Sequence, residues 1–389
     1  MPLFRRAKIL PQIDTIIDCT DKLLHQWRHQ IDGEIHTNIV DQCQKLLLNI
    51  FGLIAFDYDL HTLDEITDPT SEQVKRALED MLSAFRMLIY SPRLIAMAYT
   101  KLSPSYRRSQ KFLKDFVDQI VEQELTNDVN VIFERKKTCL IASLVASLQE
   151  DEKLEAMKAE DDRRGEQEYF ISISSIDDDC LGLTRAEVLN EILGFLIAGY
   201  ETTSTALAWF IHLVSKYPRV QAKIKEELFQ MDARRELTIE RLDSMIYLDC
   251  VIKEVLRFRL PAEGSIRTLT ADDRLPESGY QLYKGDSVFI PFNNLAYDTR
   301  YWTIDPHIFS PERFLTDDKN HHPLAYLPFG NGHRQCLGKD LALFELKVMA
   351  ARLMQFVTFG DGGDDVNAGG HLLGVTTMPR YVGVTIHFD

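Results

Sequence analysis

Phe329-Gly-Asn-Gly-His-Arg-Gln-Cys-Leu-Gly338 is the stretch of sequence that decides the fold of this chain. Three glycines lie around Cys336, and glycine permits a sharp turn or a close approach of the backbone to a flat ligand. The stretch leads into 341–353, where apolar residues at helical spacing predict a helix with Cys336 near its N-terminus. Backbone N–H groups and the positive dipole end of such a helix stabilise a thiolate. The loop therefore predicts an anionic sulfur ligand.

A thiolate so placed is a soft ligand for haem iron, and backbone N–H groups near the sulfur tune its electron donation. Arg334 is a candidate partner for a haem propionate, and Phe329 is a candidate cover for the thiolate. A single cysteine is more often a small buried apolar residue. Here, however, six of ten positions match the pattern Phe-Gly-x-Gly-x-Arg-x-Cys-x-Gly in a loop that opens a helix. At these residues the chain resembles the cytochrome P450 superfamily of haem-thiolate monooxygenases, in which the position of His333 is variable.

Composition places the chain among ordinary globular proteins. It has 389 residues, of which 45% are hydrophobic and 26% charged. The net charge of −15 argues against a nucleic-acid partner, because phosphate binding needs a basic surface. The six cysteines include no Cys-x-x-Cys pair, which favours reduced thiols over a disulfide framework or a zinc site. The longest apolar runs, 46–56 and 192–199, are too short to span a bilayer, so neither a transmembrane helix nor a signal peptide is expected.

Apolar residues recur at helical spacing in several segments of the first 260 residues. These segments predict helices at 14–28, 39–56, 71–90 with Ser71 as its N-cap, 106–124, 139–148, 220–231 and 248–259. The apolar stretch 94–102 is either a substrate lid or membrane-dipping loop, or a connection packed on the core. Residues 149–183 are dense in charged and polar side chains, and we interpret them as a solvated linker.

A longer helix is predicted from Thr184, where Glu187 completes a capping box, to about residue 217. The sequence at its centre is Ala198-Gly-Tyr-Glu-Thr-Thr203. One stripe of this helix carries a carboxylate and two hydroxyls on an otherwise apolar segment, and its members are Ala198, Glu201, Thr202 and Thr205.

Polar groups buried on such a helix cost free energy unless something uses them. The hydroxyl of Thr202 either bonds the carbonyl four residues back and bends the helix, or acts with Glu201 to deliver protons to oxygen on the iron. Gly199 has no side chain and so leaves room for a small molecule beside the helix. The segment matches the family's Ala-Gly-x-Glu-Thr-Thr motif, and the resemblance implies that it forms the distal wall of a haem pocket.

Glu254 and Arg257 lie three residues apart on the predicted helix 248–259. Such a pair is common on solvated helices and contributes only about 0.2–0.5 kcal/mol there. On a mostly apolar helix the pair needs further partners. Arg313, in Pro311-Glu-Arg-Phe314, supplies one by resemblance, because the family clamps its Glu-x-x-Arg helix to a downstream arginine. These three residues are assigned to fold and cofactor retention, not to chemistry.

The pattern changes after Pro261 to alternating and β-branched residues, which predicts short strands at 265–270, 281–283 and 287–290. The tail, 375–388, is predicted to form a closing hairpin. Arg267 matches a family arginine that binds a haem propionate; the alternative is an exposed arginine on a strand.

The resemblance implies a mainly α fold with a small β region, formed by a single cytochrome P450 domain over 1–389. It implies haem b and the reaction RH + O2 + two electrons + two protons giving ROH and water. Cys336 would be the proximal ligand, and Glu201 and Thr202 the catalytic proton carriers. The cofactor-binding residues implied are Cys336, Arg334, Arg267, Phe329, Gly330, Gly338, Ala198 and Gly199.

The implied partners follow from the same resemblance. A reductase of the NADPH-cytochrome P450 reductase type would dock near Arg334 and Lys339. Substrate contacts would come from 94–102, Phe195 and 261–266, whose apolar character implies a small lipophilic substrate. The expected location is the cytoplasmic face of the endoplasmic reticulum, with peripheral membrane contact.

The chain departs from the membrane-bound members of this family at its front. Those proteins begin with an anchor helix, a proline-rich hinge, a β-rich segment and a helix whose Trp and Arg reach the haem, and this chain is predicted to be N-terminally truncated relative to them. Phe4-Arg-Arg6 would be the remnant of that last helix. Two alternatives stand beside the monooxygenase. One is a haem-thiolate isomerase or dehydratase acting on a peroxide, and the other, motivated by the missing front, is a non-catalytic remnant.

Overall fold

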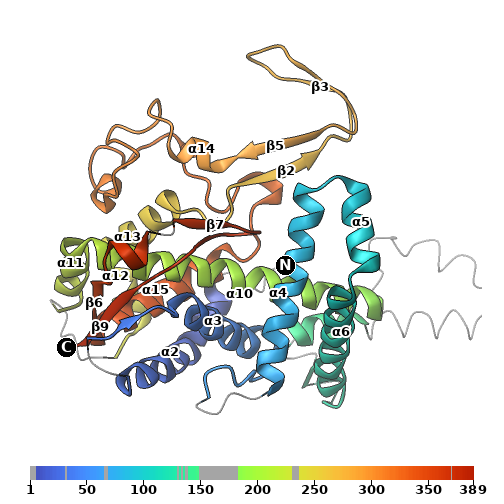
Figure 1. Cartoon of the computed structure of the whole chain (residues 1–389), viewed down its shortest axis with the longest axis horizontal. Coiled ribbons are helices and arrows are strands. Elements are labelled where there is room, and N and C mark those ends of the chain that lie inside the picture. Colours follow the sequence, from blue (N-terminus) through green and yellow to red (C-terminus); the bar gives the residue numbers. More distant parts are fainter. Residues whose placement is uncertain are drawn as a thin grey trace, which may run out of the picture. The chain divides into compact units, whose positions relative to one another are not determined.

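The computed structural model describes residues 6–30, 33–64, 69–128, 131–132, 135, 139–148, 183–229, 236–368 and 370–389. The predicted linker, 149–183, lies outside these residues except for Leu183. The chain divides into two compact units: one contains the described residues of 1–8 and 48–200, and the other those of 9–47 and 201–389. Most of the described chain is helical and its strands are short, which confirms a mainly α fold with a small β region (Figure 1).

Two long helices contribute to both units. Helix α3 (Ile39–Phe56) passes from one unit to the other after Leu47, and helix α10 (Arg185–Lys216) does so after Tyr200. Helix α3 is the one helix of the described residues that is long and apolar enough to cross a membrane, by length and composition alone. Its mean hydropathy is 1.4, and 78% of its residues are buried. Burial of this extent is typical of a core helix.

The first unit is built from helices, with α4 packed along α6 and α5 packed on both. Their bounds are α4 (Pro69–Tyr90), α5 (Arg93–Leu102) and α6 (Pro104–Leu125), and residues 140–148 are also helical. The hydroxyls of Ser105 and Ser109 on α6 donate to Oδ2 of Asp80 on α4 at 2.7 and 2.6 Å. These polar contacts join the solvent-facing side of the two helices.

Two expectations in this unit need correction. Ser71 is not the N-cap of α4, because the helix begins at Pro69; proline lacks an N–H and has a fixed φ, which suits a first turn. Ser71 is buried inside the helix and donates its hydroxyl to the carbonyl of Leu60. The stretch 94–102 is not a loop but most of helix α5, which starts just after Pro92 and is rich in the helix formers Leu, Ala and Met.

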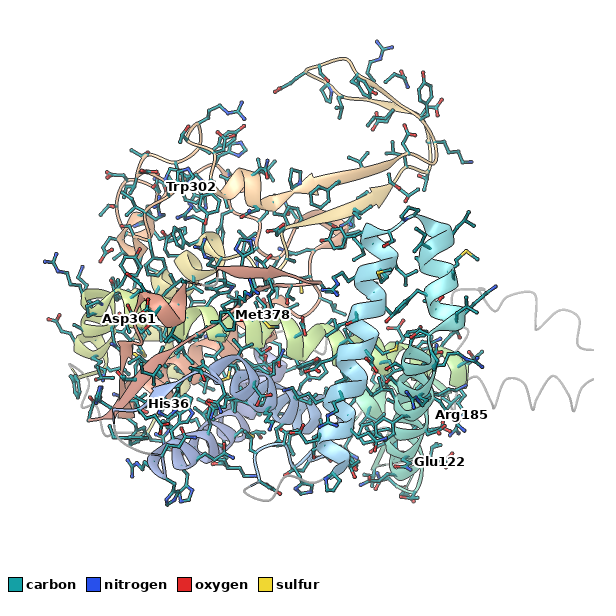
Figure 2. The ribbon with its side chains drawn as sticks, in the orientation of Figure 1. His36, Glu122, Arg185, Trp302, Asp361 and Met378 are labelled. Carbon is teal, nitrogen blue, oxygen red and sulfur yellow. The ribbon has the colours of Figure 1, made fainter. Side chains whose placement is uncertain are left out.

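The start of α10 has the predicted capping box. The N–H of Thr184 donates to Glu187 Oε2 at 2.9 Å, and the N–H of Glu187 donates to the Thr184 hydroxyl at 3.3 Å. Arg185, the first residue of the helix, donates from Nη2 to Asp118 Oδ1 at 2.8 Å and to Glu122 Oε1 at 2.6 Å (Figure 2). The beginning of α10 is thereby fixed against α6.

The second unit is organised around helix α15 (Lys339–Phe356), which packs on α2 (Ile13–Arg28), α11 (Pro218–Phe229) and α13 (Ile246–Phe258). Arg352 of α15 makes a bidentate contact with Asp21 of α2, with both N–O distances at 2.7 Å. Among the described residues the short helices are α1 (Arg6–Ile9), α12 (Ile239–Ser244), α14 (Phe292–Ala296) and α16 (Asp364–Asn367). The 3-10 helices described are η1 (Leu10–Gln12), η3 (Pro311–Phe314), η4 (Pro323–Ala325) and η5 (Gly332–Arg334).

The described residues of this unit also form four small antiparallel sheets. The three-stranded sheet has the order β1 (Ile35–His36), β9 (Val384–Phe388), β6 (Val357–Asp361). The two-stranded sheets are β2 (Gly264–Thr268) with β5 (Ser287–Pro291), β3 (Asp273–Arg274) with β4 (Gln281–Leu282), and β7 (His371–Leu373) with β8 (Thr377–Pro379). The predicted closing hairpin of the tail is therefore wrong: β8 pairs with β7, whereas β9 pairs with β6 and β1 and buries Val384 and Ile386.

Candidate functional site

The cysteine loop is closed by its own backbone. Gly330 and Gly332 have φ values of +68° and +71°, a conformation that favours glycine. The N–H of Cys336 donates to the carbonyl of Phe329 at 2.9 Å, and the Asn331 side chain accepts from the N–H of Gly332 at 2.8 Å. Gly338 precedes α15 with an ordinary φ of −86°. The backbone conformation therefore favours glycine at only two of the three glycine positions around Cys336.

The sulfur of Cys336 lies just before α15 on a solvent-exposed side chain. Protein atoms around the thiol still remove enough water to raise its pKa, because desolvation disfavours the charged form. A backbone hydrogen bond from Gly338 and the charge of Lys339 act in the opposite direction. The predicted stabilisation of a thiolate at the helix start is thus present, but desolvation outweighs it in the free thiol. Coordination of a metal ion would deprotonate the sulfur directly.

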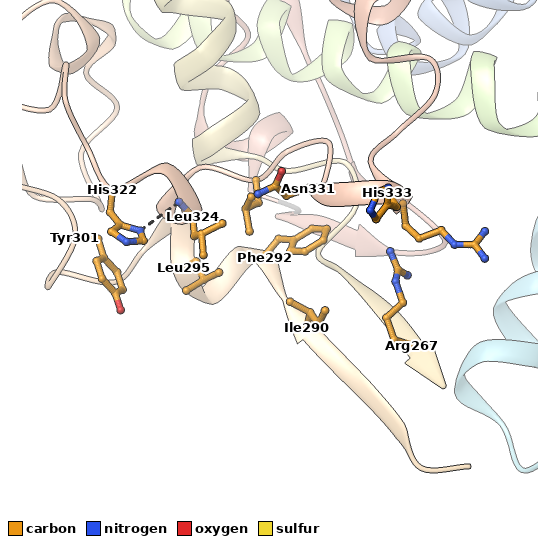
Figure 3. A pocket seen from close by; sticks show the side chains of 11 residues that line it. Arg267, Ile290, Phe292, Leu295, Tyr301, His322, Leu324, Asn331 and His333 are labelled. Atoms are coloured by element: carbon orange, nitrogen blue, oxygen red, sulfur yellow. Dashed lines mark hydrogen bonds between the residues drawn. The ribbon is translucent and has the colours of Figure 1, made fainter. Parts of the chain in front are cut away.

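A pocket of about 470 Å³ adjoins this loop (Figure 3). Arg267 and His333 lie at one end of it, Tyr301 and His322 lie at the other, and Phe292 lies between them. The lining residues are Arg267, Ile290, Phe292, Leu295, Tyr301, His322, Leu324, Leu327, Asn331, His333 and Arg334. Basic side chains beside an apolar floor suit a flat, largely apolar ligand that carries carboxylates.

The structure brings Arg267 and Arg334 to this one pocket from segments 67 positions apart. Arg267 lies on β2, where its Nη1 donates to the carbonyl of Ile266 at 2.8 Å and to the hydroxyl of Ser265. Arg334 ends the 3-10 helix η5 of the cysteine loop. Two guanidinium groups with N–H donors left for a ligand match two carboxylates by charge and by geometry.

Glu254, Arg257 and Arg313 form one fully buried cluster. Arg257 donates from Nε to Glu254 Oε2 at 2.7 Å and from Nη2 to Glu254 Oε1 at 2.9 Å. Arg313 donates from Nε to the same Oε1 at 3.0 Å. Further Arg257 donors reach the carbonyls of Ala296 and Pro306 at 2.7 and 2.9 Å. Helix α13 is thereby tied to the segment that precedes the cysteine loop.

Asp318 is a fourth member of this cluster that the sequence reasoning missed. It is 2% exposed and accepts from Nη1 of Arg313 at 3.1 Å. It also accepts from the backbone N–H groups of Thr303 and Ile304 at 2.6 and 3.2 Å. With Asp318 included, two carboxylates balance two guanidinium groups, which a buried cluster requires. No local motif marks it, because its role depends on where the irregular segment folds back.

Glu201 is buried on α10, and Thr202 beside it is half-buried. Glu201 Oε1 accepts a hydrogen bond from the hydroxyl of Thr376 at 2.8 Å. The Thr376 hydroxyl in turn accepts from that of Thr205 at 3.3 Å. Thr376 was not predicted, since 175 positions separate it from Glu201 and nothing in the local sequence marks it.

Ala198 and Gly199 belong to the first unit, on the same helix. Ala198 is exposed and Gly199 half-buried. A Cβ on Gly199 would lie 2.3 Å from Cε2 of Phe51, so the ring of Phe51 on α3 fills the space beside this glycine. The expectation that Gly199 leaves room for a small molecule is corrected, because its missing side chain allows the parts of α3 and α10 that belong to the first unit to approach closely.

Comparison with known proteins decides the family. The family model "Cytochrome P450" matches residues 1–368. The chain belongs to the cytochrome P450 family. It is 28% identical over 363 residues to cytochrome P450 3A14 of Cavia porcellus (92% of this chain, 66% of the relative) and 26% identical over 371 residues to the probable cytochrome P450 6a14 of Drosophila melanogaster (92% and 68%). A shorter match, 36% over 189 residues, is to cytochrome P450 4V2 of Mus musculus (47% and 35%). This P450 chain thus spans about two thirds of the length of the first two relatives.

The residues of this P450 chain fit the haem expected of the family. The donor set combines the sulfur of one exposed cysteine, Cys336, with two guanidinium groups on a pocket that adjoins the same loop. A Cβ on Gly332 or Gly338 would meet nothing within 4 Å, so the backbone of the loop offers open space to a flat ring. Thiolate ligation and carboxylate binding are the two functions that haem retention needs.

Proposed function

We propose that this P450 chain is a haem-thiolate monooxygenase that inserts one oxygen atom of O2 into a small lipophilic substrate. The observation that carries the proposal is Cys336, an exposed residue in a glycine-containing loop whose Arg334 shares a pocket with Arg267. The overall reaction is RH + O2 + two electrons + two protons giving ROH and water, so the site must supply a metal ligand and a proton path.

The cofactor proposed is haem b. Bound haem supplies the activation of O2 for insertion into the substrate. Cys336 provides its sulfur ligand, and Arg267 and Arg334 bind its two carboxylates. Gly330 and Phe329 shape the loop, because Gly330 takes a left-handed backbone conformation and the carbonyl of Phe329 accepts from the N–H of Cys336. Gly338 leaves open space beside the loop.

Glu201 and Thr202 are proposed to carry the two protons. Glu201 is buried, so water does not compete freely for its carboxylate, and this carboxylate can hold a proton between deliveries. Thr202 can both donate and accept, which suits it to pass a proton onward from the neighbouring carboxylate. A haem-thiolate isomerase or dehydratase acting on a peroxide would not need this pair, and its presence on α10 favours the monooxygenase.

Electrons are proposed to come from a reductase of the NADPH-cytochrome P450 reductase type. Arg334 is exposed and Lys339 half-buried, and both lie beside the cysteine loop. Basic groups there attract an acidic partner surface although the whole chain has a net charge of −15, because docking depends on the local field.

Peripheral membrane contact is proposed for the α4–α5 apolar surface, which consists of Phe85, Leu88, Leu94, Ile95 and Leu102. Between 50% and 80% of the area of each of these side chains is exposed. Large exposed apolar side chains on two helices that pack together favour an interaction surface. A membrane on this surface agrees with the proposed location at the cytoplasmic face of the endoplasmic reticulum.

The reduced, carbon-monoxide difference spectrum of the purified chain tests the central proposal. We expect a thiolate-type Soret band that is lost in Cys336→Ala and retained in Cys19→Ala, which removes a buried sulfur elsewhere in the same unit. Reductase-supported hydroxylation of lipophilic compounds then tests the reaction. Absence of the thiolate band in the native chain would contradict the proposal, and haem binding without reductase-dependent turnover would favour the isomerase or dehydratase.

Flotation with phospholipid vesicles tests the membrane contact. Leu94→Ser combined with Leu102→Ser should reduce vesicle binding, because these are the most exposed apolar side chains of the surface, at 80% and 77%. The matched control is Ile246→Ser, which removes a 61% exposed apolar side chain from α13. Equal binding by all three proteins would exclude this surface as the membrane contact.

A further inference from the structure

Thr376 places a hydroxyl on the carboxylate of Glu201 from a distant part of the chain. It lies in the turn between β7 and β8, is 2% exposed, and donates to Glu201 Oε1 at 2.8 Å. Thr205, one turn after Glu201 on α10 and fully buried, donates to the Thr376 hydroxyl at 3.3 Å. The three side chains form a buried line of two hydroxyls that ends on a carboxylate oxygen.

The turn that carries Thr376 is fixed on both sides of that residue. The carbonyl of Thr376 accepts from the N–H of Gly374 at 3.0 Å. The next residue, Thr377, accepts from Nε1 of Trp209 on α10 at 2.7 Å and donates its N–H to the carbonyl of Pro261 at 2.8 Å. The Thr376 hydroxyl therefore meets Glu201 from a held backbone and not from a free loop.

A hydroxyl donor held in this way does two things to a buried carboxylate. It selects one side-chain orientation, because Oε1 must keep facing the donor. It also stabilises the ionised form, because hydrogen bonds to a charged acceptor are stronger than neutral ones. Thr205 completes the arrangement by donating to Thr376, which leaves the single proton of the Thr376 hydroxyl directed at Glu201.

We propose that Thr376 is a positioning residue for Glu201, supported by Thr205, and that its hydroxyl sets the orientation in which the Glu201 carboxylate holds and releases a proton. The inference rests on the proposed function only in assigning that proton to the oxygenation reaction. The contact itself joins two residues of this chain, so it can be tested with or without haem.

Infrared spectroscopy of the chain labelled with ¹³C-carboxyl glutamate tests the contact, with Glu201→Gln used to assign the band. Thr376→Val removes the hydroxyl at nearly constant volume, and Thr376→Ser retains it. The matched control is Thr377→Val, which removes the neighbouring buried hydroxyl. We expect Thr376→Val to shift the Glu201 band, and Thr376→Ser and Thr377→Val to leave it in place. Thr205→Val should give a smaller shift in the same direction, which keeps the test open if Thr376→Val does not fold.

The haem-loaded protein provides the second readout. Thr376→Val should lower the ratio of product formed to O2 consumed by about tenfold, while Thr376→Ser recovers it. An unchanged Glu201 band in both Thr376→Val and Thr205→Val would overturn the proposal, as would a fall in the product ratio that Thr376→Ser does not restore. If the native chain has no thiolate band or turnover, the proposed function fails, while the infrared result still decides whether Thr376 positions Glu201.

Discussion

Helices α13 and α15 each bury one glutamate completely, and the two carboxyl groups have opposite surroundings. Glu254 on α13 accepts hydrogen bonds from Arg257, Arg313 and the N–H of Ser310. Glu345 on α15 is 1% exposed, and its Oε1 has no hydrogen-bond partner among the described residues. Burial raises the pKa of Glu345 to about 8. Burial without a partner therefore makes a carboxyl keep its proton near neutral pH. Partners of opposite charge instead let a buried carboxylate stay ionised and link separate segments of the chain.

Removing a cation from the buried cluster around Glu254 should have the largest effect on stability. Arg313→Met leaves Glu254 and Asp318 with one guanidinium between them. We expect a loss of about 3–5 kcal/mol in the free energy of unfolding, measured with urea, because an uncompensated charge would remain buried. Arg300→Met is the control, since Arg300 pairs with Asp298 on the surface. A similar fall in the unfolding midpoint for both variants would show that burial is not the cause.

The next largest effect is expected from Glu345, which should make the free energy of unfolding depend on pH. A carboxyl whose pKa rises from 4.5 to about 8 on folding keeps its proton where the unfolded chain has lost it. Stability should therefore fall as pH rises from about 4.5 to about 8, at up to about 1.4 kcal/mol per pH unit. Glu345→Gln cannot ionise and should remove this dependence. The free energy of unfolding of both proteins, measured at pH 5 and pH 8, checks this prediction. An equal change between the two pH values in the native chain and in Glu345→Gln would contradict it.

The pocket arginines should give the smallest effect on folding and a clear effect on haem. Arg267→Gln and Arg334→Gln should each speed haem loss to an excess of a haem-binding apoprotein by about tenfold, or about 1.4 kcal/mol. Neither variant should move the urea midpoint of the haem-free chain, because neither guanidinium belongs to the buried cluster around Glu254. Arg300→Gln again serves as the control. A fall in the haem-free midpoint comparable to that of Arg313→Met would place these arginines with the structural cluster.

Sequence patterns located most helices of the chain and the cysteine loop, because these depend on residues that are close together in sequence. Helix 39–56 was predicted with its observed bounds, and the capping box of Thr184 and Glu187 follows from a spacing of three. Several of the errors arose where a partner from another part of the chain decides the contact. The ring of Phe51 fills the space beside Gly199, and the hydroxyl of Ser71 donates to the carbonyl of Leu60. The two strands of the tail, β8 and β9, belong to different sheets.

By itself the sequence determined the P450 family, the mainly helical architecture and the identity of Cys336 as the candidate metal ligand. A glycine-rich turn and a 3.6-residue apolar period are local properties of the chain. Only the tertiary structure decided that Asp318 balances the charge of the buried cluster and that Thr376 donates to Glu201. The same holds for Oε1 of Glu345, which has no hydrogen-bond partner among the described residues. Whether a buried polar group is satisfied depends on atoms that folding brings together from distant positions, and no local pattern records that.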